Sequence, residues 1–232
     1  MRMRIWSTGA LALLLAACGN QSPGVAEPQA ALEEALPVMG PEQTILAFGD
    51  SLFAGYQVDE DDGYPEKLEA TLRGRGINAR VIDAGVSGDT TAAGLARLAF
   101  VLDNAGEAPD LVIVELGGND LLRGISPDQT RANLESILKE LSQRELPVLL
   151  MGMRAPPNYG PEYQQAFDAL YPQLAKQFGA ALYPFFLESI YERPELNMAD
   201  RIHPTAEGIE VLVSATVDTV VAALPEAEAE AE

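Results

Sequence analysis

The feature that most limits how this chain can fold is its pattern of short apolar runs. No polar residue interrupts these runs, and longer amphipathic segments separate them. Residues 111–114 and 147–151 are two such runs. Runs of this kind are typical of strands that are covered on both faces, as in a parallel sheet. We therefore expect buried strands, and the sequence places them at 44–49, 79–85, 110–116, 147–152 and 181–185.

The segments between these runs carry helical spacing. Leucine and isoleucine recur on one helical face over 134–141, after Ser126 as the cap and Pro127 in the first turn. Another helix is expected to start near 160–161, and a last one to span 206–223. Strands joined by helical crossovers predict a three-layer α/β/α flavodoxin-like sandwich with a five-stranded parallel sheet. If the strand order is 2-1-3-4-5, the first three strands are neighbours.

The first residues have the three parts of a secretory leader. Arg2 and Arg4 precede an apolar stretch at 5–15, which is too short to span a membrane, and Leu-Ala-Ala-Cys follows at 15–18. That last sequence resembles a bacterial lipoprotein box, which implies cleavage before Cys18 and lipidation of this residue. The alternative is ordinary signal cleavage nearby, with Cys18 incidental. Because Cys18 is the 1 cysteine of the chain, no intrachain disulfide is possible.

Four segments follow from these patterns. We expect a lipoprotein-type signal peptide at 1–17, a flexible tether rich in Ala, Glu, Pro and Gln at 18–41, one globular domain at 42–224 and an acidic tail at 225–232. The expected location is the bacterial cell envelope, in the periplasm and held to a membrane through the lipid on Cys18. The domain is expected to be a monomer.

The charge balance argues against one class of partner. The formal net charge is −20, from 15 basic and 35 acidic residues, and no basic patch interrupts the acidic composition. Nucleic acid is therefore excluded as an expected partner. The acidity is interpreted as a solvated, soluble surface.

The stretch 45–56 carries the residue that points most directly to chemistry. Its apolar run stops at Gly49, and Ser51 follows just past the carboxyl end of the strand. Ligands bind at this edge in open α/β sheets, and helix-start N–H groups there can stabilise an oxyanion. We interpret Ser51 as a nucleophile. Asp50 is assigned a structural role in shaping the turn, since adjacent side chains point apart.

His203 is the 1 histidine of the chain, so a neutral imidazole base must be this residue. Asp200 lies three residues earlier, and Pro204 fixes the backbone just after. A compact turn can bring the carboxylate of Asp200 to Nδ1 of the ring. Nε2 is then free to take a proton from Ser51.

Two glycine-bearing turns supply candidate oxyanion donors. Gly88 follows the second strand and can offer a backbone N–H, and Asn119 follows the third strand and can offer a side-chain amide. With the N–H of Ser51 they would form a three-donor oxyanion hole. The alternative is that the glycines only permit tight turns.

Together these blocks carry a resemblance. Gly-Asp-Ser-Leu at 49–52, Gly88, Gly-Gly-Asn-Asp at 117–120 and Asp-x-x-His at 200–203 resemble, in order, the four blocks of the SGNH/GDSL hydrolase superfamily. The resemblance covers residues 44 to about 223. It implies a flavodoxin-like fold, Ser51 as nucleophile, Asp200 and His203 as the other triad members, and Ser51, Gly88 and Asn119 as oxyanion donors.

Residues 87–98, 114–124, 156–160 and 183–187 are similar to the bacterial periplasmic thioesterase/lysophospholipase/arylesterase branch of this superfamily. That similarity implies a promiscuous esterase for acyl esters, thioesters and lysophospholipids. The lipoprotein box and tether differ from the best-known members of the branch, which are free periplasmic proteins.

Substrate contacts are expected beside the oxyanion asparagine and after the fourth strand. An apolar acyl groove would be lined by Leu121, Leu122, Ile125, Pro156 and Tyr159. The alternative is that these residues belong to the core or to loops.

Arg123 and Arg154 are candidate contacts for an anionic head group, or else solvated surface charges. No cofactor or metal is expected, because hydrogen bonds polarise the carbonyl and the sequence shows no ligand cluster.

Two other functions fit the same scaffold. One is a non-catalytic binding lipoprotein, and the other is a carbohydrate O-deacetylase. A flavin-binding protein is a weaker interpretation of the fold.

Overall fold

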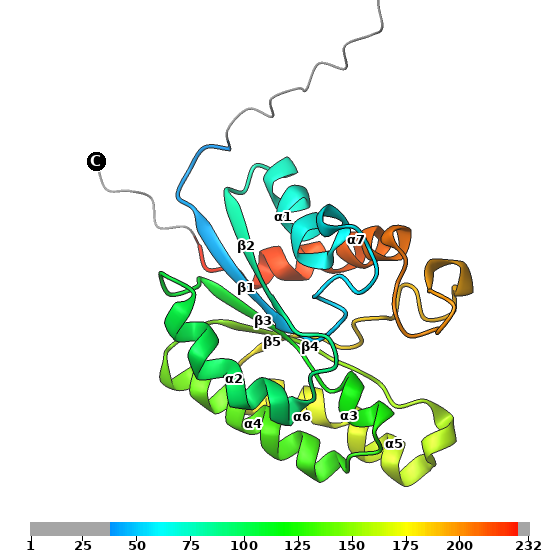
Figure 1. The fold of residues 1–232 in the computed structure, drawn as a ribbon. Helices are drawn as coiled ribbons and strands as arrows, with labels where there is room; N and C mark the ends of the chain where they lie inside the picture. Colours follow the sequence, from blue (N-terminus) through cyan, green and yellow to red (C-terminus); the bar gives the residue numbers. More distant parts are fainter. Residues whose placement is uncertain (1–37, 227–232) are drawn as a thin grey trace, which may run out of the picture. The chain divides into compact units, whose positions relative to one another are not determined.

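The computed structural model describes residues 38–226 (Figure 1). The predicted signal peptide, Cys18, most of the tether and the end of the acidic tail lie outside the described residues. Five strands form one sheet in the order β2-β1-β3-β4-β5, and every pairing is parallel, as predicted. Their bounds are β1 Gln43–Gly49, β2 Ala79–Gly85, β3 Leu111–Glu115, β4 Val148–Met151 and β5 Ala181–Tyr183.

Helices cover both faces of the sheet, which gives the predicted three layers (Figure 1). One face carries α1 (Tyr64–Gly74) and α7 (Ala206–Ala223), and the other carries α2 (Thr91–Asn104), α4 (Pro127–Gln143) and α6 (Leu170–Phe178). The shorter helices α3 (Gly118–Leu122) and α5 (Pro161–Asp168) follow β3 and β4 in the chain. Single turns of 3-10 helix lie at Glu60–Asp62, Pro157–Tyr159 and Pro194–Leu196.

The predicted helix starts are confirmed. The hydroxyl of Ser126 accepts a hydrogen bond from the N–H of Gln129 at 3.3 Å, and Pro127 is the first residue of α4. The helices α5 and α7 also begin where the sequence indicated. The helix α3 was not predicted, because five residues are too few to show a period. The break between α5 and α6 at Ala169 was not predicted either.

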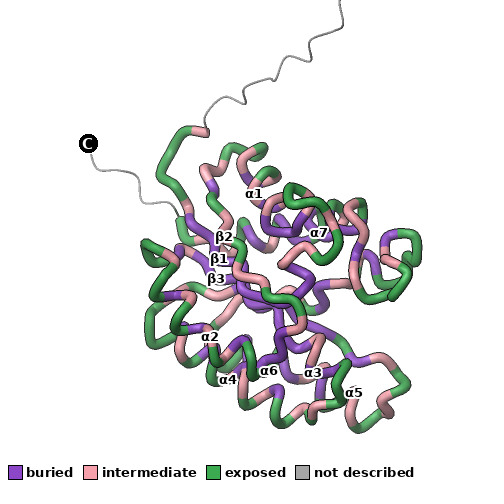
Figure 2. Tube along the Cα trace, in the orientation of Figure 1, coloured by how far each residue is buried: buried purple, intermediate pink, exposed green. Residues whose placement is uncertain are grey.

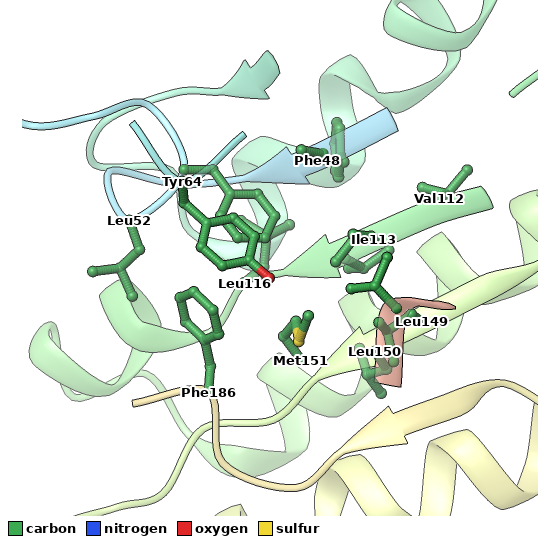
Figure 3. Close-up of a cluster of buried hydrophobic side chains, with 14 of the residues drawn as sticks. Phe48, Leu52, Tyr64, Val112, Ile113, Leu116, Leu149, Leu150, Met151 and Phe186 are labelled. Atoms are coloured by element: carbon green, nitrogen blue, oxygen red, sulfur yellow. The ribbon is translucent and has the colours of Figure 1, made fainter. Parts of the chain in front are cut away.

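The three central strands form the core. Every residue of β3 is buried, as are all residues of β1 after Gln43 and of β4 after Val148 (Figure 2). Their side chains, including Phe48, Ile113 and Leu150, belong with Tyr64 and Phe186 to one buried apolar core (Figure 3). The edge strands β2 and β5 are only partly buried, so burial on both faces holds for the centre of the sheet alone.

Parallel pairing brings the carboxyl ends of all five strands to one edge of the sheet. The loops that follow β1, β2 and β3 therefore meet there, since these strands are neighbours. Within residues 38–226, no helix combines the length and the apolar character needed to cross a bilayer.

Candidate active site

Ser51 lies two residues after β1, in a turn that the surrounding backbone leaves little freedom to change. The residue is 9% exposed. The carbonyl of Asp50 accepts a hydrogen bond from the N–H of Ala54 at 3.0 Å, which reverses the chain after the strand. A Cβ atom on Gly49 would lie 2.7 Å from the ring of Phe53 and 2.9 Å from the carbonyl oxygen of Glu115. Glycine is therefore required just before the serine turn.

The structure brings Ser51, His203 and Asp200 together. The Nε2 atom of His203 lies 2.8 Å from Oγ of Ser51, and Nδ1 lies 2.7 Å from Oδ2 of Asp200. Both distances are within hydrogen-bonding range, in the order hydroxyl, imidazole, carboxylate. The ring of Tyr56 lies 4.1 Å from the imidazole between centroids, so it also contacts the histidine.

Asp200 and His203 lie on a short loop that is closed by an antiparallel bridge between Asn197 and Pro204. The Oδ1 atom of Asp200 accepts the N–H groups of Ile202 at 2.9 Å and His203 at 3.1 Å. The hydrogen bond from the imidazole, together with these backbone donors, lowers the pKa of Asp200 to about 2. The carboxylate is therefore ionised and fixed against the ring.

Asn119 lies in the first turn of α3, and its side chain is oriented by Asp50. Nδ2 of Asn119 donates to Oδ2 of Asp50 at 2.8 Å. A primary amide has two N–H donors, so one remains available to a ligand. Asn119 lines the same cavity as Ser51 and His203. Asp50 also accepts the N–H of Leu52 at 3.0 Å, which agrees with the predicted role in shaping the turn.

Gly88 lies on the loop after β2 and does not line that cavity. Its φ is 86°, a left-handed conformation that favours glycine. Arg123 donates from Nη2 to the carbonyl oxygen of Gly88 at 2.8 Å. Arg123 therefore contacts the loop that carries the third predicted oxyanion donor.

Polar contacts join the three loops. Arg97 pairs with Asp89 at 2.6 Å and donates to the carbonyl oxygen of Gly49 at 2.9 Å. The carboxylate of Asp120 accepts the N–H of Thr91 at 2.7 Å. Sequence reasoning did not assign these roles, because they depend on contacts between loops that are distant in the chain.

The cavity beside Ser51 has a volume of about 170 Å³ and is mainly apolar. Leu121, Leu122 and Pro156, which the sequence placed in an acyl groove, line it. Sequence reasoning missed a second set of lining residues, which comprises Phe185, Leu187, Tyr191, Arg201 and Ile202. Phe185 and Leu187 follow β5, so the position of strand ends could have indicated them.

Three of the predicted substrate contacts do not line this cavity. Arg123 bonds to the Gly88 loop, as described above. The hydroxyl of Tyr159 donates to the carbonyl oxygen of Leu121 at 2.7 Å, and the carbonyl oxygen of Ile125 accepts from Tyr163 at 2.7 Å. Of these three residues, Tyr159 contacts a residue that lines the cavity, Leu121.

Arg154 does line the cavity, with its guanidinium 5.1 Å from the centroid of the Phe185 ring. Among residues 38–226, no group of three or more His, Cys, Asp and Glu side chains is placed to hold a metal ion.

The sequence profile of the GDSL-like Lipase/Acylhydrolase family matches residues 47–211. The chain belongs to this family. The matched region runs from β1 to α7 and includes Ser51, Asn119, Asp200 and His203.

Relatives of this GDSL-family chain are named as esterases. Esterase TesA of Pseudomonas aeruginosa is 45% identical over 162 residues, which are 70% of this chain and 80% of that protein. Thioesterase 1/protease 1/lysophospholipase L1 of Escherichia coli strain K12 is 43% identical over 164 residues, 71% of this chain and 76% of that protein.

This chain is also similar to the crystal structure of AlinE4, an SGNH-hydrolase family esterase. The match covers 81% of this chain and 99% of the AlinE4 chain, with 61% sequence identity and a TM-score of 0.69. The family and the fold predicted from the sequence are therefore confirmed. This GDSL-family protein is a carboxylic ester hydrolase.

Proposed function

We propose that this protein is a serine esterase that hydrolyses acyl esters and thioesters through an acyl-enzyme on Ser51. The observation that carries the proposal is the continuous contact from the hydroxyl of Ser51 through the imidazole of His203 to the carboxylate of Asp200. That arrangement lets the imidazole remove the hydroxyl proton while the carboxylate stabilises the imidazolium.

Acyl transfer proceeds in two steps. Oγ of Ser51 attacks the acyl carbonyl carbon, and its proton passes to Nε2 of His203. The amide of Asn119 and the backbone N–H groups of Ser51 and Gly88 stabilise the oxyanion. The imidazolium then protonates the leaving alcohol or thiol, and the acyl-enzyme remains. In the second step His203 deprotonates water, which attacks the acyl-enzyme and restores Ser51.

The cavity supports an apolar acyl group and a varied leaving group. Leu121, Leu122, Phe185 and Leu187 offer apolar contact to the acyl chain. Arg154 at the same cavity offers a cation to the phosphate of a lysophospholipid or a thioester cofactor. The relatives named thioesterase and lysophospholipase support these substrate classes.

Acyl chain length tests the acyl group directly. The cavity of about 170 Å³ is smaller than the roughly 300–1,000 Å³ of sites for drug-sized ligands. We therefore expect kcat/KM for p-nitrophenyl laurate not to exceed that for p-nitrophenyl butyrate, since methylenes beyond the cavity stay in water and add no binding free energy.

The measurement is a series of kcat/KM values for oxygen esters, thioesters and acetylated sugars, with Ser51→Ala as the blank for each substrate. A preference for acetylated sugars over every simple ester would instead favour a carbohydrate O-deacetylase. Laurate as the best ester would contradict the proposed size limit.

Lipid anchoring through Cys18 is a separate proposal, supported by the sequence 15–18 alone. Cys18→Ser should move the esterase activity from the membrane fraction to the soluble fraction and abolish incorporation of labelled palmitate. Its specific activity should not change. An unlabelled wild-type protein that is already soluble would contradict the anchor.

A further inference from the structure

Glu115 is a buried carboxyl group to which the proposed mechanism gives no role. It is the last residue of β3, it is 0% exposed, and it pairs in register with Gly49 of β1 and Met151 of β4. Burial of a carboxyl group in the middle of a sheet costs stability unless a specific contact compensates. Its position one strand-width from the serine turn suggests where that contact lies.

The contacts of Glu115 lead to the oxyanion asparagine. Oε2 of Glu115 accepts the backbone N–H of Asp50 at 3.4 Å, and no described residue forms a hydrogen bond with Oε1. Asp50 is itself 2% exposed. Its two carboxylate oxygens accept the N–H of Leu52 and the amide of Asn119. A continuous series of hydrogen bonds therefore runs from Glu115 through Asp50 to Asn119 and ends at the cavity.

Glu115 and Asp50 differ in protonation state. Burial, and then the charge of Asp50, raise the pKa of Glu115 well above its ordinary value. Burial raises the pKa of Asp50 as well, but the N–H of Leu52 and the amide of Asn119 both donate to its carboxylate and act against that rise, so we assign the negative charge to Asp50. A neutral Glu115 adds no second charge beside Asp50 and keeps an oxygen that accepts the N–H of Asp50.

We propose that Glu115 is a positioning residue for the oxyanion hole, because it holds Asp50 in the place from which Asp50 orients the amide of Asn119. Glu115 does not line the cavity, so it acts through these two residues rather than on the substrate. The proposal rests on the proposed function, in which Asn119 is an oxyanion donor.

A double-mutant cycle between Glu115 and Asn119 tests the proposal. Glu115→Met keeps the approximate volume but removes the polar contact, and should lower kcat for p-nitrophenyl butyrate by about 10- to 100-fold with KM within about twofold. In an Asn119→Ala background the same substitution should have no further effect on kcat, because the oriented group is already absent.

Glu115→Gln should keep kcat within about threefold of wild type, because its amide oxygen can still accept the N–H of Asp50 and the side chain stays neutral. Val112→Ala, at the other end of β3, is the control: it should lower the melting temperature without changing kcat. If Glu115→Met fails to fold, Glu115→Asp, which withdraws the carboxyl group by one methylene, replaces it in the cycle with the same expectation.

These outcomes distinguish a failure of the positioning role of Glu115 from a failure of the oxyanion role of Asn119. Equal fold-losses from Glu115→Met, or from Glu115→Asp in its place, in both Asn119 backgrounds would overturn the positioning role, as would unchanged kcat in the wild-type background. A large loss in Glu115→Gln would overturn it too. If Asn119→Ala alone leaves kcat unchanged, the oxyanion assignment itself fails.

Discussion

Ser51→Ala should lower kcat for p-nitrophenyl butyrate by about 10⁴- to 10⁶-fold while the protein stays folded. The hydroxyl makes the covalent bond in the proposed mechanism, and alanine supplies no nucleophile in its place. Ser51 contributes its hydrogen bond to His203 but little apolar packing, so the melting temperature should change by only a few degrees. Steady-state kinetics and a thermal melt on the same preparation measure both effects.

Ser87→Ala is the matched control. Ser87 is exposed on the loop after β2, next to Gly88, so it undergoes the same chemical change close to the site. Its kcat should remain within about twofold of wild type, as expected for a surface position. Wild-type turnover in purified Ser51→Ala would show that another group performs the chemistry.

His203→Ala should lower kcat about as far as Ser51→Ala, because an unassisted hydroxyl is a weak nucleophile at neutral pH. The double variant Ser51→Ala/His203→Ala should be no slower than either single variant, since residues that act as a unit are not additive. Multiplicative losses would indicate that the two residues act independently. The measurement is kcat for the two single variants and the double variant under one set of conditions.

The pH dependence follows from the charge of Asp200. With the pKa of Asp200 lowered to about 2, its carboxylate stays ionised throughout the assay range. The stability that it contributes is present above its ordinary pKa of 3.8 and is lost only as the pH falls through about 2. Loss of kcat/KM in mild acid must therefore come from a group other than Asp200.

We then expect protonation of one group to account for the loss of kcat/KM on the acid side of the pH profile. The logarithm of kcat/KM should fall with a slope of one as the pH decreases, and it should level off on the alkaline side of that range. A slope of two would show that a second group, such as Asp50, whose pKa is raised by burial, takes up a proton in the same range.

Much of the fold and of the candidate site could be predicted from two features of the sequence, the positions of strand ends and the presence of a single histidine. The three layers follow from uninterrupted apolar runs joined by helical segments, because only strands covered on both faces tolerate such runs. The same rule places Ser51, Gly88 and Asn119 at one edge of the sheet. A chain with one histidine leaves a single choice of imidazole, and the spacing to Asp200 is short enough to be a local turn.

The remaining parts depend on register and on side-chain direction, which the local sequence does not specify. The contact of Glu115 with Asp50, which lies 65 residues away in the chain, exists because Glu115 pairs with Gly49 across two neighbouring strands. Tyr159 and Ile125 do not line the cavity, and the side-chain bond from Tyr159 to the carbonyl oxygen of Leu121 was likewise not predictable from the local sequence.

Covalent labelling tests the central claim most directly. The wild-type enzyme should react with a fluorophosphonate to give one stoichiometric adduct by intact-mass spectrometry, and peptide mapping should locate it on Ser51. Ser51→Ala should remain unlabelled, whereas Ser87→Ala should label at the wild-type rate. A stoichiometric adduct on any residue other than Ser51, or an active enzyme that never acquires one, would contradict the proposed mechanism.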